Sequence, residues 1–181
     1  MQATSIEHSK ARNKTLIVSA DPHGYTSTVA HAIAMRLRSL GHDVHFGDAL
    51  VSRPPPPVDY DAVIFGTEHG ERRDRRALGE YIARYREPLE RLPTGLFVVT
   101  RRPPRDPRQP IEAFETSVGW RAKFAAGIDC KRVGIGRTLM RRVMHFVLRH
   151  LEGAIAAENR EEIHALVDAM EREVARSVRR Y

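Results

Sequence analysis

The sequence predicts an α/β fold, an open, doubly wound parallel sheet of five strands with helices on both faces. Short apolar runs rich in branched residues alternate along the chain with segments of helical periodicity. Each connection between successive strands is long enough for a crossover helix, which parallel strands require. A chain of 181 residues has room for one such unit. We therefore expect residues 1–13 to form a flexible leader and residues 14–181 to form a single domain.

The first half of the chain supplies three strands. Lys14–Ala20 (KTLIVSA) predicts a strand, and turn residues and a helix over Thr26–Leu40 follow it. Asp43–Asp48 is the second expected strand. Asp61–Gly66 (DAVIFG) is continuously apolar, which is typical of a central strand that is buried on both faces.

The second half of the chain is regular up to the fourth strand and less regular beyond it. Arg75–Leu92 has helical periodicity, and Thr94–Thr100 (TGLFVVT) is the fourth expected strand. A stiff basic loop, Arg101–Pro110, comes next. The other expected elements are a short helix over 111–119, a strand within Trp120–Val133, and helices over Arg137–Leu151 and Asn159–Arg179.

The positive charge is concentrated in one segment. The formal net charge is +7, and residues 101–150 carry 12 Lys or Arg against 4 Asp or Glu. Such an excess predicts an acidic partner that presents carboxylates, phosphates or an anionic membrane surface. Because the segment lacks the aromatic-basic motif of RNA-binding sheets, we expect no nucleic-acid partner.

Composition also restricts the other classes of function. Cys130 is the only cysteine, which excludes an intramolecular disulfide and a cysteine-cluster metal site. The nine histidines show no recognisable metal-ligand spacing, so we expect no metal. No run is apolar enough to span a bilayer, and the first residues lack the apolar core of a secretory signal. We therefore expect a cytoplasmic location.

The expected topology places a ligand site at one edge of the sheet. With the strand order 2-1-3-4-5, ligands bind beyond the carboxyl ends of the strands, between strands one and three. The loops to inspect are Ser19–Thr28, Gly66–Arg75 and Thr100–Arg108. The first loop places hydroxyl residues and a glycine at the start of a helix, where backbone N–H groups can hold a phosphate. The alternative is that these residues only turn the chain and cap the helix.

The order and spacing of these segments resemble a known family. Strand one, the hydroxyl-rich turn, DYDAVIFGT, a helix ending in LERLP and a fourth strand that runs into a basic loop are similar to the bacterial flavodoxin-like, menaquinone-linked protoporphyrinogen oxidases. The resemblance covers roughly residues 14–150. It implies a flavodoxin-like fold, FMN as the cofactor, and porphyrinogen oxidation in heme biosynthesis with electrons passing to a quinone.

The resemblance also implies a set of site residues. The phosphate of FMN would be held by Ser19, His23, Gly24, Tyr25 and Thr26. The isoalloxazine ring would be bordered by Thr67, Glu68, His69, Gly70, Thr100, Arg101 and Arg102. The propionates of a porphyrin-like or other acidic small molecule would pair with Arg101, Arg102 and Arg105. No residue is assigned as a catalytic acid or base.

The phosphate loop departs from the T-x-T-G-x-T pattern of the family. Gly24 and Thr26 match the pattern, whereas Asp21 and His23 replace hydroxyl residues. Asp21 would place a negative charge beside the phosphate, and Pro22 removes an N–H donor. The two ring loops contain no Trp, Tyr or Phe to stack on a flavin. These departures support a second hypothesis, a flavodoxin-like domain that has lost flavin binding and acts as a binding or regulatory module at a membrane or on a partner protein.

The segment Arg137–His150 (RTLMRRVMHFVLRH) alternates apolar and basic residues, which predicts a basic amphipathic helix. Such a helix can attach a protein peripherally to an anionic membrane surface, here the inner membrane face. The residues expected to face the membrane are Arg137, Arg141, Arg142 and Arg149. The alternative is an ordinary helix that covers the sheet and exposes its arginines to water.

Overall fold

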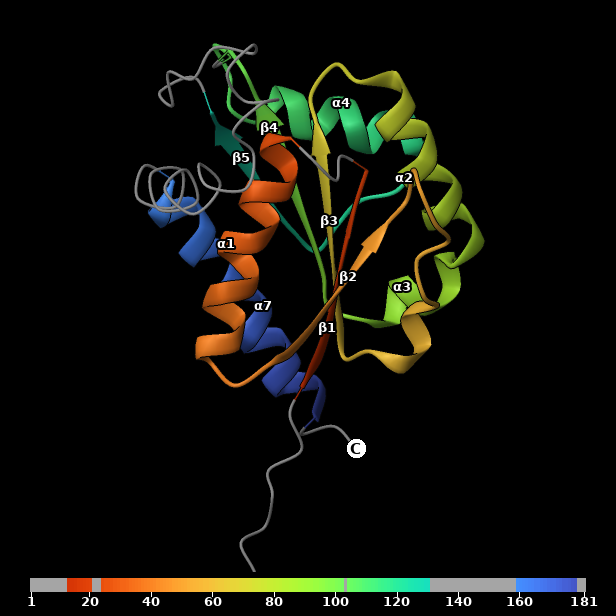
Figure 1. Cartoon of the computed structure of the whole chain (residues 1–181), viewed down its shortest axis with the longest axis vertical. Helices are drawn as coiled ribbons and strands as arrows, with labels where there is room; N and C mark the ends of the chain where they lie inside the picture. Colours follow the sequence, from red (N-terminus) through yellow and green to blue (C-terminus); the bar gives the residue numbers. More distant parts are fainter. Residues whose placement is uncertain (1–12, 21–23, 103, 131–158, 179–181) are drawn as a thin grey trace, which may run out of the picture.

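The computed structural model describes residues 13–20, 24–102, 104–130 and 159–178. Five parallel strands form one sheet in the order β2-β1-β3-β4-β5 (Figure 1). The strands are β1 (Lys14–Ser19), β2 (Asp43–Asp48), β3 (Ala62–Glu68), β4 (Thr94–Thr100) and β5 (Phe124–Asp129). The strand order and the parallel pairing confirm the fold class that the sequence predicts.

Helices cover both faces of the sheet (Figure 1). On one face lie α1 (Tyr25–Ser39) and α7 (Arg160–Val178), and α7 packs against β5 and α1. On the other face lie α2 (Arg72–Arg84), α3 (Arg86–Arg91) and α4 (Gln109–Val118). A short 3₁₀ helix, η1 (Pro57–Asp59), precedes β3. The sheet is therefore the middle layer of three.

The central strands are apolar throughout because each of them contributes side chains to two hydrophobic cores, one on each face of the sheet. In β1, Ile17 packs under α1 and α7, while Leu16 and Val18 belong to the core under α2 and α4. Successive side chains of a strand point to opposite faces, so both sets must be apolar. In β3 the packing is tight, since a Cβ at Gly66 would overlap the fully buried ring of Phe97.

The predicted helix over 75–92 is wrong in one respect, because the structure has two helices there. The first, α2, begins three residues earlier and ends at Arg84, and α3 follows after Tyr85. Pro88 explains the break, since a proline ring clashes with the carbonyl four residues before it, which belongs to Arg84. Strand β3 also runs two residues beyond the predicted Gly66, to Glu68.

The later elements lie close to their predicted positions. Strand β5 falls within the predicted range 120–133, and α4 and α7 begin and end within two residues of the ranges predicted for them. The helix predicted over 137–151, with Arg137, Arg141, Arg142 and Arg149, lies outside the described residues. In the described ranges no helix has both the length and the apolar character that a membrane crossing requires.

Candidate functional site

Three strands of the sheet end at the same edge. Ser19 at the end of β1 pairs with Gly66 of β3, and Glu68 at the end of β3 pairs with Val99 of β4. The loops that leave β1, β3 and β4 therefore meet at this carboxyl edge, the upper edge in Figure 1. The direction in which successive strands are added to the sheet reverses between β1 and β3, and open parallel sheets bind ligands at the carboxyl edge beside such a reversal.

The start of α1 presents a helix N-terminus that no side chain of the helix caps. Gly24 is the N-cap residue and makes no side-chain capping hydrogen bond, and the first turn holds no acidic residue. The first helical bond runs from the Thr28 N–H to the Gly24 carbonyl at 3.3 Å. The N–H groups before Thr28 consequently have no acceptor within the helix.

Thr26, in the first turn of α1, carries a buried hydroxyl that lacks a partner. The residue is 0% exposed, and among the described residues its Oγ1 makes no hydrogen bond. Thr28, two residues further along the helix, differs because its hydroxyl donates to the Gly24 carbonyl at 3.4 Å. An anion at the helix N-terminus would supply the acceptor that Thr26 lacks. The donors present here fit the phosphate of FMN.

An ion pair joins the second and third loops. The guanidinium of Arg101 contacts both carboxylate oxygens of Glu68, with one hydrogen bond of 2.8 Å from Nη2 to Oε2. The Glu68 side chain is only 6% exposed, whereas that of Arg101 is half-exposed. The hydrogen bond to Glu68 raises the pKa of Arg101, burial acts in the opposite direction, and the negative charges of Glu68 and Glu71 raise it further. The ion pair thus holds a cation where the second and third loops meet.

The remaining residues of the predicted ring site fall into two groups. Thr67 and Thr100 are buried, and their hydroxyls donate to the backbone carbonyls of Glu68 at 3.5 Å and Ile128 at 3.4 Å. His69 and Gly70 are exposed, and Gly70 turns the chain with φ +93°. The small cavity beneath them has a volume of about 10 Å³, enough for one water molecule. Of these four residues, only His69 and Gly70 are exposed enough to contact a ligand.

Arg102 and Arg105 follow on the surface. Both are exposed, and neither pairs with a carboxylate of the described residues. Arg101, by contrast, is committed to Glu68, which the sequence analysis did not anticipate. Two of the three predicted substrate cations are therefore free of internal partners.

Some predicted features lie outside the described residues. These include His23, with its neighbours Asp21 and Pro22, and residue 103 of the third loop. The ligand cleft predicted at the carboxyl edge therefore stays a prediction. Among the described residues no group of three or more His, Cys, Asp or Glu side chains is placed to hold a metal ion.

Comparison with known proteins places the fold in a family. The family model of the flavodoxin domain matches residues 16–152. The chain is similar to the flavodoxin-like domain of a Synechococcus protein, with 16% identity, a TM-score of 0.51, and coverage of 92% of this chain and 98% of that one.

It is also similar to the two-electron reduced flavodoxin of Megasphaera elsdenii, with 16% identity, a TM-score of 0.50, and coverage of 62% of this chain and 84% of that one. At this level of identity the two structures show a shared fold. No curated protein sequence matches the chain significantly. Because the family model spans most of the sequence and the strand order agrees with it, this chain belongs to the flavodoxin domain family.

Proposed function

We propose that this chain binds FMN at the carboxyl edge of its sheet and is a flavin-dependent oxidoreductase. The observation that carries the proposal is the buried hydroxyl of Thr26 at the N-terminus of α1, which has no hydrogen-bond partner among the described residues. Leaving a buried polar group unsatisfied costs about 1–3 kcal/mol. A phosphate at this position would accept a hydrogen bond from the hydroxyl and would interact favourably with the helix dipole.

The chain's own residues would then orient the flavin. Tyr25, half-buried at the start of α1, and His69, exposed at the end of β3, supply the only rings that the described loops offer to it. The Glu68–Arg101 pair places a cation of fixed position at the same edge, and the carboxylate prevents the guanidinium from swinging away. Bound FMN supplies the hydride or electron transfer, so no acid or base of the protein is required.

The finer proposal concerns the substrate. A porphyrinogen or a similar acidic molecule carries carboxylates, and beside the proposed ring site Arg102 and Arg105 are exposed cations that pair with no carboxylate of the described residues. A quinone is the proposed electron acceptor. Replacing both arginines with glutamine should raise KM for a carboxylated porphyrinogen while FMN affinity stays the same. An unchanged KM would exclude these two residues from substrate binding.

The direct experiment is the visible spectrum of the purified chain, followed by titration with FMN. We expect a flavin absorbance band that shifts on binding, and tighter binding by the Asp21→Thr variant, because a hydroxyl donor replaces a negative charge near the phosphate. Equal affinity in the two proteins would contradict the placement of the phosphate.

The second candidate function is a flavodoxin-like module that has lost its flavin. The described residues of the second and third loops contain no Trp, Tyr or Phe that could stack on a flavin, and this favours the second candidate. Absence of FMN binding by both the natural chain and the Asp21→Thr variant would establish this candidate in place of the oxidoreductase. The same titration therefore separates the two functions.

Attachment to a membrane is a further part of the proposal, supported by the basic and apolar composition of residues 137–150. The chain should bind anionic vesicles but not neutral ones, and added salt should weaken the binding. Most of the binding should disappear when glutamine replaces Arg141, Arg142 and Arg149. If the natural chain ignores anionic vesicles, or if the triple variant unfolds, the segment only covers the core.

A further inference from the structure

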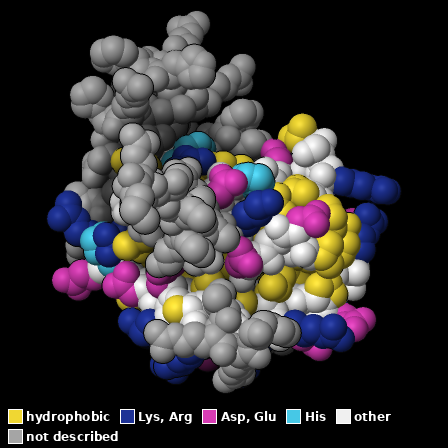
Figure 2. All heavy atoms as spheres, turned by 90° about the horizontal axis from the view of Figure 1, so that it is seen from below, with side chains coloured by type: hydrophobic (Ala, Val, Ile, Leu, Met, Phe, Trp, Pro, Cys, Tyr) yellow, Lys and Arg dark blue, Asp and Glu magenta, His cyan; other side chains and the backbone are white. Residues whose placement is uncertain are grey.

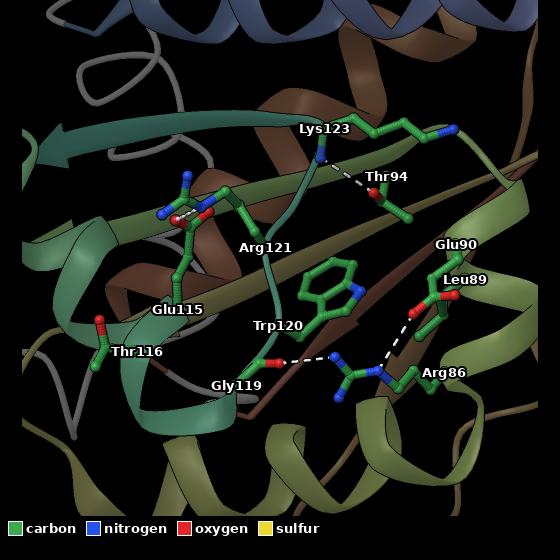
Figure 3. Close-up of a pocket in the computed structure, with 10 residues that line it drawn as sticks. All are labelled: Arg86, Leu89, Glu90, Thr94, Glu115, Thr116, Gly119, Trp120, Arg121 and Lys123. Carbon is green, nitrogen blue, oxygen red and sulfur yellow. Dashed lines mark hydrogen bonds and ion pairs between the residues drawn. The ribbon is translucent and has the colours of Figure 1, made fainter.

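A cavity of about 450 Å³ lies at the opposite edge of the sheet, where β4 and β5 begin (Figure 3). It is bounded by α3, by the C-terminal end of α4 and by the segment that leads into β5. This volume is within the range of small-molecule sites, about 300–1,000 Å³. We propose that this cavity is a second binding site, which takes a small organic anion carrying a carboxylate or phosphate group.

Trp120 supplies an N–H donor in the wall of the cavity. It is 6% exposed and packs edge-on against the fully buried Phe65, with the ring centroids 5.3 Å apart. Within the part of the chain that the structure describes, its indole N–H makes no hydrogen bond, and the nitrogen is not among the buried polar atoms without a partner, so it is open to solvent from the cavity. Figure 3 shows the indole nitrogen on the side of the ring that faces Leu89 and Glu90. This N–H group is therefore available to donate to an acceptor atom of a ligand in the cavity.

The carboxylates that line the cavity already have partners. Glu115 pairs with the Nε of Arg121 at 3.1 Å. Glu90 accepts a hydrogen bond from the Nε of Arg86 at 3.2 Å, and the Nη2 of Arg86 donates to the Gly119 carbonyl at 3.0 Å. These bonds are drawn in Figure 3. A cationic ligand would therefore compete with guanidinium groups for each of these acceptors.

Lys123 is the cation that remains. Its backbone N–H donates to the Thr94 hydroxyl at 3.2 Å, but its ammonium group makes no ion pair with any described residue. The side chain extends toward the α3 side of the cavity in Figure 3. The residues that line the cavity include three cations, Arg86, Arg121 and Lys123, and two anions, Glu90 and Glu115. The unpaired charge is positive, so the matching ligand is an anion.

Charges of both signs lie on the face of the molecule where the strands begin (Figure 2). In the view from below, with the amino ends of the strands toward the reader, basic and acidic side chains of the described residues are interspersed around apolar ones (Figure 2). A broad field of one sign would attract any polyanion, whereas this arrangement favours a ligand that fits the cavity.

The cavity is separate from the proposed flavin site. Strand β4 runs from Thr94 at the cavity to Thr100 at the carboxyl edge, and a strand of that length spans about 20 Å. A ligand in the cavity would not touch FMN, so it would be a second ligand and not the substrate of flavin chemistry. The inference therefore does not depend on the proposed function.

The sequence provides a specific probe, because Trp120 is the only tryptophan in the chain. The full chain is titrated with inorganic phosphate and, separately, with succinate, at constant ionic strength maintained with sodium chloride, while tryptophan fluorescence is recorded. We expect a saturable change with at least one of the two, and the one that saturates at the lower concentration identifies the anionic group that the site prefers.

Variants decide whether the change reports this site. Lys123→Gln should weaken binding about tenfold, because a hydrogen bond to a charged group is lost. Arg76→Gln is the matched control, an exposed arginine of α2 outside this cavity, and should leave binding unchanged. Trp120→Phe, followed by calorimetry in place of fluorescence, should also weaken binding. The proposal is overturned if neither anion gives a saturable change, or if Lys123→Gln binds as tightly as the natural chain.

Discussion

Replacement of Thr26 by valine separates a structural role of this residue from a role in binding. Valine has nearly the same shape as threonine but lacks the hydroxyl. In the structure that hydroxyl is buried at the start of α1 and, among the described residues, has no hydrogen-bond partner. Its removal therefore takes away no contact of the ligand-free protein, but it takes away a donor to a phosphate.

The expected magnitudes have opposite signs for folding and for binding. An unsatisfied buried hydroxyl costs about 1–3 kcal/mol, so Thr26→Val should raise the free energy of unfolding of the FMN-free chain by about 1 kcal/mol. A hydrogen bond to a charged group is worth about 1.5–3 kcal/mol, so the Kd for FMN should rise about tenfold to hundredfold. The same change should stabilise the protein and weaken its binding.

Thr28→Val is the matched control. Thr28 is as deeply buried as Thr26, but its hydroxyl donates to the Gly24 carbonyl. Losing this bond should lower the free energy of unfolding by about 0.5–1.5 kcal/mol. The assay is urea unfolding of the FMN-free proteins, combined with FMN titration of each. If Thr26→Val destabilises the chain as Thr28→Val does and leaves FMN affinity unchanged, the reasoning about the orphan hydroxyl is refuted.

Three further predictions concern stability. Arg101→Gln leaves the buried Glu68 carboxylate without its partner and should lower the free energy of unfolding in urea by about 1–3 kcal/mol. Arg102→Gln is the control and should change this free energy little. Equal effects of the two variants would contradict the ion pair between Arg101 and Glu68. Burial raises the pKa of Glu115 above 4.5, so its contribution to stability is present in acid and declines as the pH rises through the raised pKa. Glu115→Gln should remove this dependence, which begins near pH 4.5 and extends upward, and an identical pH profile in the variant would count against it. Gly66→Ala should lower the thermal midpoint through a loss of about 1–3 kcal/mol, since the added methyl overlaps a buried ring; an unchanged midpoint would mean that the core relaxes freely.

The sheet could be predicted from the sequence because the signal that defines it is local. Each central strand supplies side chains to two cores, and this produces the continuous apolar runs of Lys14–Ala20, Asp61–Gly66 and Thr94–Thr100. The break at Tyr85 had a visible signal in Pro88, three residues later. The helical periodicity of the segment outweighed that signal, so the prediction joined two helices into one.

The contacts within the two sites could not be predicted, because they depend on tertiary structure. The pairing of Glu68 with Arg101 joins residues 33 positions apart, which become neighbours only when β3 and β4 pair. Trp120 was taken only as the start of the segment that holds the fifth strand, and its place in a cavity depends on α3 and α4. Thr26 was assigned to the phosphate loop through the resemblance, but only the structure shows that its hydroxyl is buried and has no partner among the described residues.

The most direct test of the central claim compares FMN with riboflavin, which has the same ring but no phosphate. The account places the phosphate at the N-terminus of α1, so the purified chain should bind FMN at least about tenfold more tightly than riboflavin. The measurement is the Kd of each compound by calorimetric titration of the same preparation. Equal affinities, or binding of neither compound, would contradict the claim that this edge of the sheet holds the phosphate of a flavin.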